Sequence, residues 1–148
     1  MSAIESQYCG YVALLGRPNV GKSTLLNRIL GQKISITSRR PQTTRHRITG
    51  IDTEGSYQTV FVDTPGIQNK HDSAIHRYMN RAASSTITDV DVIVMVVDRL
   101  SWTEEDKYVA DSIANAGVPV ILVINKVDRV VDKNKLLPHM QELAKHLT

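Results

Sequence analysis

The sequence contains few of the features that mark exported or membrane-spanning proteins. Cys9 is the single cysteine among 148 residues, so no internal disulfide can form and a reducing compartment is expected. The chain does not open with a basic start followed by an apolar stretch, which argues against a secretory signal. The longest apolar runs, at 92–97 and 118–124, are far shorter than the roughly 20 residues that span a bilayer. We therefore expect a cytoplasmic protein without a transmembrane segment.

An excess of one charge is also missing, and aromatic residues make up only 5% of the chain. The 18 Lys and Arg against 15 Asp and Glu leave a formal net charge of +3, so the molecule is not a polycation built to coat nucleic acid. A length of 148 residues suits one domain with a proper core. We find no internal repeat, low-complexity tract or interdomain linker.

Alternating strand and helix patterns predict an α/β fold with a mostly parallel sheet and one antiparallel hairpin. The expected strands are 11–15, 47–53, 57–62, 91–98 and 118–124. A first helix is expected where Leu25, Leu26, Ile29 and Leu30 recur at helical spacing, and later helices are expected at 75–86, 103–116 and 132–147. Gly31 is placed to end the first helix, and Thr103 with Asp106 resembles a capping pair at the start of the third. The last helix carries an apolar stripe expected to cover the sheet, formed by Leu136, Leu137, Met140, Leu143, Ala144 and Leu147.

Residues 16–23 fit the phosphate-loop pattern Gly-x-x-x-x-Gly-Lys-Ser between an expected strand and an expected helix. Small residues let backbone N–H groups surround phosphates, while Lys22 adds a point charge and the helix amino end adds its dipole. Ser23 is expected to ligate Mg²⁺ directly. The expected nucleotide-binding residues of this segment are Gly16, Arg17, Pro18, Asn19, Val20, Gly21, Lys22, Ser23 and Thr24.

A second motif, Asp63-Thr64-Pro65-Gly66, follows the hairpin and is continued by Ile67. The Asp63 carboxylate can hold Mg²⁺ through water, and the Gly66 backbone N–H can bind a γ-phosphate. Thr43 and Thr44 lie in a polar loop and are both candidates to complete the Mg²⁺ shell. Loops of this kind become ordered on a triphosphate and relax on its hydrolysis.

The third motif, Asn125-Lys126-Val127-Asp128, ends a buried strand. A carboxylate accepts two hydrogen bonds at once, and guanine presents adjacent N1–H and N2–H donors to it. The motif therefore predicts guanine as the base. An ordinary polar turn is the alternative for these four residues alone, but the two upstream motifs stand in the order that a nucleotide site needs.

Together these residues resemble the translation-factor-like small GTPases and, specifically, the Era family of bacterial ribosome-assembly GTPases. The stretches that carry the resemblance are 16–27, 32–38, 42–47, 63–66 and 125–128, of which 32–38 and 42–47 are the Era-like part. The resemblance implies a P-loop GTPase (Ras-like) three-layer fold that binds GTP or GDP with Mg²⁺ and hydrolyses GTP. It also implies binding to 16S rRNA of the small ribosomal subunit and peripheral association with the inner membrane. We expect no stable oligomer.

The resembled pattern favours Thr44 over Thr43 as the metal-binding threonine, because Thr44 stands just before Arg45. The expected metal ligands are then Ser23, Thr44 and Asp63. The residues expected to act on the transferred phosphoryl group are Asn19, Lys22, Thr44 and Gly66.

Two positions in these motifs affect the expected chemistry. Ile67 stands where Ras-like enzymes place a glutamine that orients water, so intrinsic hydrolysis is expected to be slow. Gln68 is a weaker substitute because its side chain should point elsewhere. Asn19 suggests a K⁺ held against the phosphates, as in related GTPases, whereas the alternative is that Asn19 merely tolerates a tight turn.

GTPases of this kind continue after the third motif with a further strand, a Ser-Ala loop that contacts guanine and, in Era proteins, a KH domain that binds RNA. The chain stops at Thr148, before these segments. We expect residues 1–148 to form a GTP-binding domain incomplete at its C-terminus, with lowered stability and nucleotide affinity.

Three alternatives remain from the sequence. A P-loop ATPase or kinase would use the same phosphate loop, although Asn125 and Asp128 argue against adenine. An RNA-binding module would contact phosphates through Arg39, Arg40, Arg45, His46 and Arg47, but the stretch lacks aromatic residues for base stacking. The basic and apolar last helix could lie on a membrane surface, although its apolar stripe is better used to cover the sheet.

Overall fold

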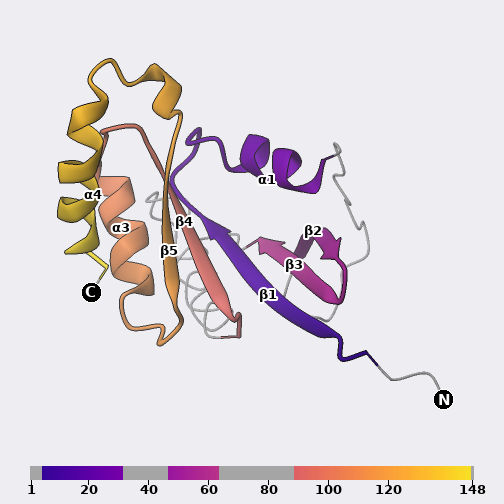
Figure 1. Cartoon of the computed structure of the whole chain (residues 1–148). Coiled ribbons are helices and arrows are strands. Elements are labelled where there is room, and N and C mark those ends of the chain that lie inside the picture. Colours follow the sequence, from indigo (N-terminus) through magenta and orange to yellow (C-terminus); the bar gives the residue numbers. More distant parts are fainter. Residues whose placement is uncertain (1–4, 32–46, 64–88, 148) are drawn as a thin grey trace.

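The computed structural model of the chain describes residues 5–31, 47–63 and 89–147, which form one five-stranded sheet with helices on both faces (Figure 1). The strand order is β2-β3-β1-β4-β5. Pairing is parallel throughout these strands except between β2 and β3, which are antiparallel. The strands are β1 (Tyr8–Leu15), β2 (Arg47–Glu54), β3 (Tyr57–Asp63), β4 (Val92–Asp98) and β5 (Val120–Asn125). The predicted mostly parallel sheet with one antiparallel hairpin is therefore confirmed.

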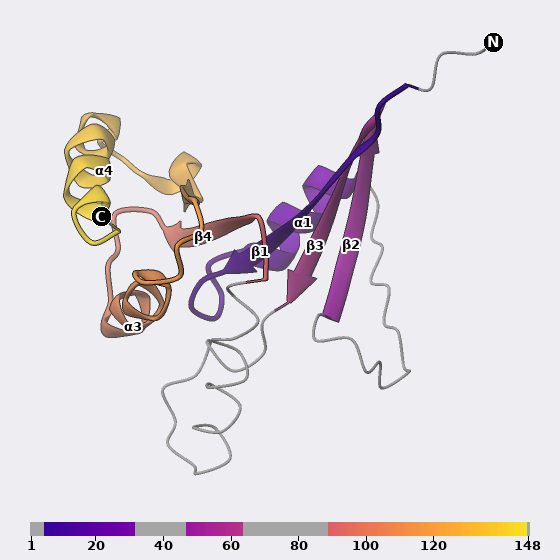
Figure 2. The same ribbon diagram turned by 90° about the horizontal axis from the view of Figure 1, so that it is seen from below.

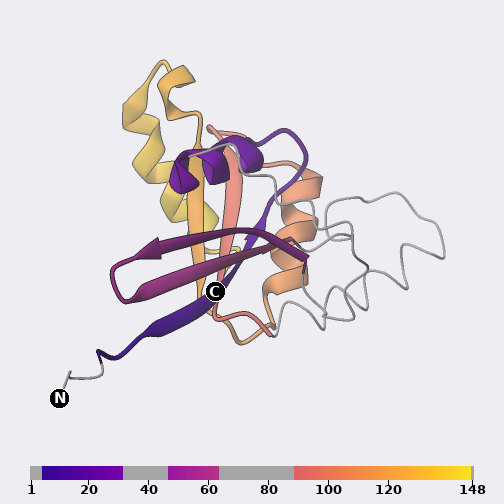
Figure 3. The same ribbon diagram turned by 90° about the vertical axis from the view of Figure 1, so that its right-hand side faces the viewer.

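Strand β4 is apolar at every position except its last residue, Asp98, because helices cover both of its faces. Helix α1 (Lys22–Leu30) lies over one face, and α3 (Glu104–Ile113) and α4 (Leu136–Ala144) lie over the other (Figures 1 and 2). In β4, Ile93, Met95 and Val97 belong to the core on the α3 side, whereas Val96 packs with Leu14 and Val20 near α1. Figure 3 shows α1 running beside the β2–β3 hairpin.

The predicted end of the first helix at Gly31 and the predicted start of α3 are confirmed. Gly31 caps α1 in the left-handed conformation, with φ of 68°. Thr103 and Asp106 form a reciprocal capping box, in which each side chain bonds the backbone N–H of the other residue. Helix α3 ends at Ile113, before the predicted 116, and Ala116 N–H then bonds the Ile113 carbonyl in a tighter turn. The helix predicted at 75–86 lies outside the described residues.

The prediction of one continuous helix over 132–147 was wrong. Two short 3₁₀ turns, Val127–Arg129 and Lys133–Lys135, precede α4, which is shorter at both ends than predicted. The Asp132 side chain accepts from Asn134 N–H at 3.1 Å and so caps the second turn instead of starting an α-helix. Pro138 has no N–H to give and fits only within the first turn of α4. These two residues explain the late start.

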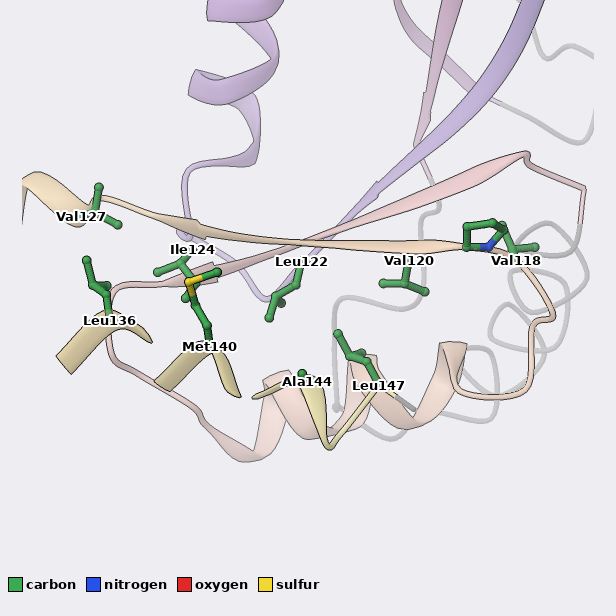
Figure 4. A pocket seen from close by; sticks show the side chains of 10 residues that line it. Val118, Val120, Leu122, Ile124, Val127, Leu136, Met140, Ala144 and Leu147 are labelled. Carbon is green, nitrogen blue, oxygen red and sulfur yellow. The ribbon is translucent and has the colours of Figure 1, made fainter. Parts of the chain in front are cut away.

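The apolar stripe of the last helix is only partly buried. Leu143 is 1% exposed, whereas Leu137 is 63% and Met140 is 49% exposed. Leu136, Met140, Ala144 and Leu147 point toward β5 and line an apolar cavity of about 690 Å³ beside it (Figure 4). The prediction that the stripe covers the sheet thus holds for Leu143 and is wrong for Leu137. None of the helices in the described ranges combines the length and hydrophobicity needed to cross a bilayer.

Candidate nucleotide-binding site

The phosphate loop connects the carboxyl end of β1 to the amino end of α1, as the motif predicted. Gly21 has φ of 96°, and a side chain there would collide with the Asn125 amide. At Gly16 a Cβ would meet the Val96 carbonyl oxygen of β4. Because the loop lies this close to β4 and β5, only glycine fits both places. No acidic residue occupies the first turn of α1, so its amino end is electrostatically suited to a phosphate.

Lys22 lies at the start of α1, with its ammonium group turned back over the loop. Its Nζ donates to the Gly16 carbonyl and to the Arg17 carbonyl at 3.3 Å. Ser23 and Thr24 follow in the same turn and are exposed. The loop therefore brings a cation, hydroxyl groups and a helix amino end together, which is the chemistry that a phosphate with Mg²⁺ requires.

The Asn-Lys-x-Asp motif lies directly against this loop. Asn125, the last residue of β5, donates its Nδ2 to the Val20 carbonyl at 2.9 Å. Lys126 donates its Nζ to the Asn19 carbonyl at 2.7 Å. Asn19 itself has φ of 65°, a conformation that asparagine tolerates better than most residues. Segments more than 100 positions apart in the sequence are thus joined by two side chain to backbone hydrogen bonds.

Asp128 follows in the 3₁₀ turn Val127–Arg129 and is exposed, as is Val127. Asp63 is the last residue of β3, the strand that pairs with β1 on the side away from β4. Its backbone therefore lies on the strand next to the phosphate loop, where a carboxylate for Mg²⁺ is expected. The other predicted site residues lie outside the described ranges: Thr43, Thr44, Thr64, Pro65, Gly66 and Ile67.

Oxygen ligands of the kind that Mg²⁺ prefers are present in Ser23 and Asp63. The described residues hold no cluster of three or more His, Cys, Asp or Glu side chains that could bind a metal alone. A Mg²⁺ at this place would therefore need phosphate oxygens and water besides Ser23 and Asp63.

Sequence reasoning missed one buried charged residue that contacts the residues of this site. Asp98, the last residue of β4, is only 6% exposed and is surrounded by cations. Its carboxylate lies 2.9 Å from Arg99 Nε, 3.7 Å from Arg17 Nη2 and 3.9 Å from Lys126 Nζ. The hydrogen bond from Arg99 holds the pKa of Asp98 below its ordinary value, against the opposing effect of burial, and Lys126 and Arg17 add to the lowering. The sequence offered one signal for Asp98. It ends a predicted buried strand, and the neighbouring strands β1 and β5 lead into the phosphate loop and the Asn-Lys-x-Asp motif.

One protein family matches most of the chain. A family model described as 50S ribosome-binding GTPase matches residues 11–126. The chain belongs to this family. Because the phosphate loop and the start of the Asn-Lys-x-Asp motif fall within the match, family membership and the site geometry agree.

Curated proteins with the name GTPase Era match nearly the whole chain. The Era protein of Yersinia enterocolitica is 58% identical over 147 residues, which is 99% of this chain and 48% of that protein. The Era protein of Yersinia pestis, strain Pestoides F, matches to the same extent. The chain thus spans about half the length of these relatives. The predicted resemblance to the Era family is confirmed.

Solved structures of the family confirm the P-loop GTPase fold. An Era variant from Aquifex aeolicus bound to GDP·AlF₄⁻ has a TM-score of 0.71 and 39% identity, covering 93% of this chain and 47% of that one. Era in complex with MgGDPNP and nucleotides 1506–1542 of 16S ribosomal RNA has a TM-score of 0.71 and 38% identity, covering 96% and 49%. The G domain of the Thermotoga maritima FeoB iron transporter, 23% identical with a TM-score of 0.62, shares the fold alone.

Proposed function

We propose that the chain is a switch domain that binds GTP or GDP with Mg²⁺ and hydrolyses GTP. The observation that carries the proposal is the pair of hydrogen bonds from Asn125 and Lys126 to the phosphate loop. They fix the base-recognition motif and the phosphate site relative to each other, which a nucleotide contacting both would require. The Era structures bound to GDP·AlF₄⁻ and MgGDPNP support the same ligands here.

The roles of the residues follow from this placement. The Asp128 carboxylate would accept from guanine N1–H and N2–H, and the phosphate loop with Lys22 would bind the phosphates. Ser23, Asp63 and Thr44 would hold Mg²⁺, which neutralises charge on the β- and γ-phosphates when bound. Gly66 would donate its backbone N–H to the γ-phosphate. The surrounding loop would thereby respond to whether the γ-phosphate is present. Turnover would be slow, because the Ile67 side chain cannot orient a water.

The test is competition between nucleotides for the unsubstituted chain. GDP and GTP should displace a fluorescent guanine nucleotide, while ADP and ATP at the same concentrations should not. Equal displacement by ATP would favour the alternative, a P-loop protein of other base preference. Released phosphate, measured with GTP as substrate and Mg²⁺ present, then tests hydrolysis separately from binding.

A K⁺ bound beside Asn19 is the further cofactor that we propose from the resemblance. A fixed cation there would neutralise charge that develops during phosphoryl transfer, so GTP hydrolysis should be faster in K⁺ than in Na⁺ at equal ionic strength. Because Asn19 has φ of 65°, Asn19→Gly removes the amide without straining the backbone and is the suitable variant. It should lose the difference between the two salts. Equal rates of the unsubstituted chain in K⁺ and Na⁺ would overturn this part.

The cellular role that we propose is assembly of the small ribosomal subunit, on 16S rRNA. It is supported by the Era relatives and by the Era structure that contains a 16S rRNA segment. We place the protein in the cytoplasm, as its single cysteine suggests, and propose peripheral association with the inner membrane on the resemblance alone. The arginines of the alternative RNA-binding reading lie in 39–47, where no side chain is described. A steep salt dependence of RNA binding by this chain would support that reading.

A further inference from the structure

Charged side chains gather between the phosphate loop, the carboxyl end of β4 and the amino end of α3, and Arg17 is at their centre. Arg17 Nε donates to Asp106 Oδ2 at 3.2 Å, and Nη2 lies 3.7 Å from Asp98 Oδ2. Nη2 also reaches the Ser101 hydroxyl at 3.5 Å. The Arg17 side chain is 19% exposed and that of Asp106 is fully buried. Water and salt therefore screen this pair much less than a surface ion pair.

The backbone of Arg17 belongs to the phosphate loop itself. Its carbonyl accepts a hydrogen bond from Lys22 Nζ at 3.3 Å, next to the carbonyl of Gly16, which Lys22 also contacts. A change in the backbone at Arg17 would therefore move an acceptor that orients the Lys22 ammonium. Anchoring the Arg17 side chain restricts such changes.

Asp106 is a rigid anchor because the α3 capping box already holds it. Its Oδ2 accepts from Thr103 N at 2.8 Å and from Thr103 Oγ1 at 3.0 Å, in addition to Arg17. The other carboxylate oxygen, Oδ1, is buried and has no hydrogen-bond partner among the described residues. The start of α3 and the phosphate loop thus share one buried carboxylate, although Arg17 and Asp106 are 89 positions apart.

We propose that Arg17 is a positioning residue for the nucleotide phosphates, which it serves by fastening the phosphate loop to the capping box of α3 through Asp106. The proposal rests on the proposed nucleotide binding and adds a residue that acts through its side chain away from the ligand. Loss of the anchor should weaken the binding of ligands that carry a β-phosphate, whereas recognition of the base should stay unchanged.

The experiment compares GDP with guanosine as ligands of three variants. Arg17→Ala removes the anchor, and Arg17→Lys keeps the charge, but a single ammonium cannot reproduce the forked contact to both carboxylates. Arg28→Ala is the matched control, since Arg28 is exposed in the last turn of α1, at the end away from the phosphate loop. Titration calorimetry measures GDP, and ligand-detected NMR measures the weaker guanosine.

We expect Arg17→Ala to weaken GDP binding about tenfold or more, as misplaced binding groups commonly do, with guanosine binding changed less than about twofold. The GDP affinity of Arg17→Lys should fall between those of Arg17→Ala and the unsubstituted chain, and that of Arg28→Ala should match the unsubstituted chain. Equal GDP affinity of Arg17→Ala and the unsubstituted chain would overturn the inference. An unsubstituted chain that binds neither ligand would instead overturn the proposed function, and the inference with it.

A second variant separates positioning from simple stability. Arg17→Ala leaves the Asp106 carboxylate buried with its cap bonds only, which should destabilise the fold. Arg17→Ala combined with Asp106→Asn removes that charge and should recover much of the lost thermal stability. Under the proposal GDP affinity stays low in this double variant. Recovery of GDP affinity together with stability would show that Arg17 only compensates a buried charge, and would overturn the positioning role.

Discussion

At the scale of single residues, the site depends on side chains that bind backbone carbonyls of the phosphate loop. Asn125 and Lys126 each hold one carbonyl, and Lys22 holds the carbonyls of Gly16 and Arg17 from within the loop. When side chains bind the carbonyls of the loop, its backbone N–H groups remain available to the phosphates. Residues usually associated with the base therefore also shape the phosphate site.

Asn125→Ala should weaken GDP binding about tenfold, because it removes the hydrogen bond to Val20 and leaves that buried carbonyl unpaired, a loss of about 1–3 kcal/mol. Direct titration with GDP is the measurement. Asn134→Ala, in the exposed 3₁₀ turn before α4, is the control and should bind GDP normally. An Asn125→Ala chain with undiminished affinity would show that the contact does not hold the loop.

Asp98 gives a prediction for pH. Its pKa in the folded chain is lowered, chiefly by the Arg99 hydrogen bond, so the ionised form contributes stability above the ordinary pKa of 3.8 and loses it as pH falls through the folded value. Unfolding by urea should show Asp98→Asn to be less stable by about 1–3 kcal/mol at pH 7. This difference should shrink below about pH 4.

The matched control for Asp98 is Asp111→Asn, which breaks an exposed pair with Lys107 and should change the free energy of unfolding by less than about 1 kcal/mol. A difference between the unsubstituted chain and Asp98→Asn that stays constant from pH 7 to about pH 3 would contradict the assigned role of the carboxylate.

At the scale of helices and strands, local sequence signals and tertiary contacts contribute differently. The strands were predictable because parallel strands covered by helices consist of β-branched and apolar runs, as in 92–97 and, on the partly buried β5, in 120–124. The α3 capping box was predictable because both partners lie within one turn. The Arg17–Asp106 contact was not, because it depends on how a loop folds back across the sheet. Helix α4 starts later than predicted because of Asp132 and Pro138. The helical spacing of apolar residues does not reveal these two local effects.

The burial pattern of α4 can be tested with two leucines of one helix. Leu143→Ala should lower the free energy of unfolding by about 2–5 kcal/mol, since the side chain is fully enclosed in the core. Leu137→Ala, at an exposed position, should change it by about 0.5 kcal/mol or less. Urea unfolding of the two variants measures both values. Equal losses would mean that the stripe covers the sheet uniformly, as the sequence alone suggested.

At the scale of the whole molecule, the sheet brings three distant segments to its carboxyl edge. The phosphate loop follows β1, Asp98 ends β4, and the Asn-Lys-x-Asp motif ends β5. Since β1, β4 and β5 are parallel neighbours, these ends lie side by side, and the short polar contacts between them form a continuous site. The order of the motifs in the sequence predicted that these segments lie together, and the parallel pairing of their strands explains why they do.

The central claim is that this edge selects a guanine nucleotide through Asp128, and Asp128→Asn tests it most directly. Affinities for GDP and for xanthosine diphosphate are measured by competition on the unsubstituted chain and on the variant. Xanthine carries an oxygen where guanine carries its N2 donor, so the amide should exchange the preference. We predict that the unsubstituted chain prefers GDP, and that the variant prefers xanthosine diphosphate with GDP binding weakened about a hundredfold. Undiminished preference for GDP in Asp128→Asn would contradict the account.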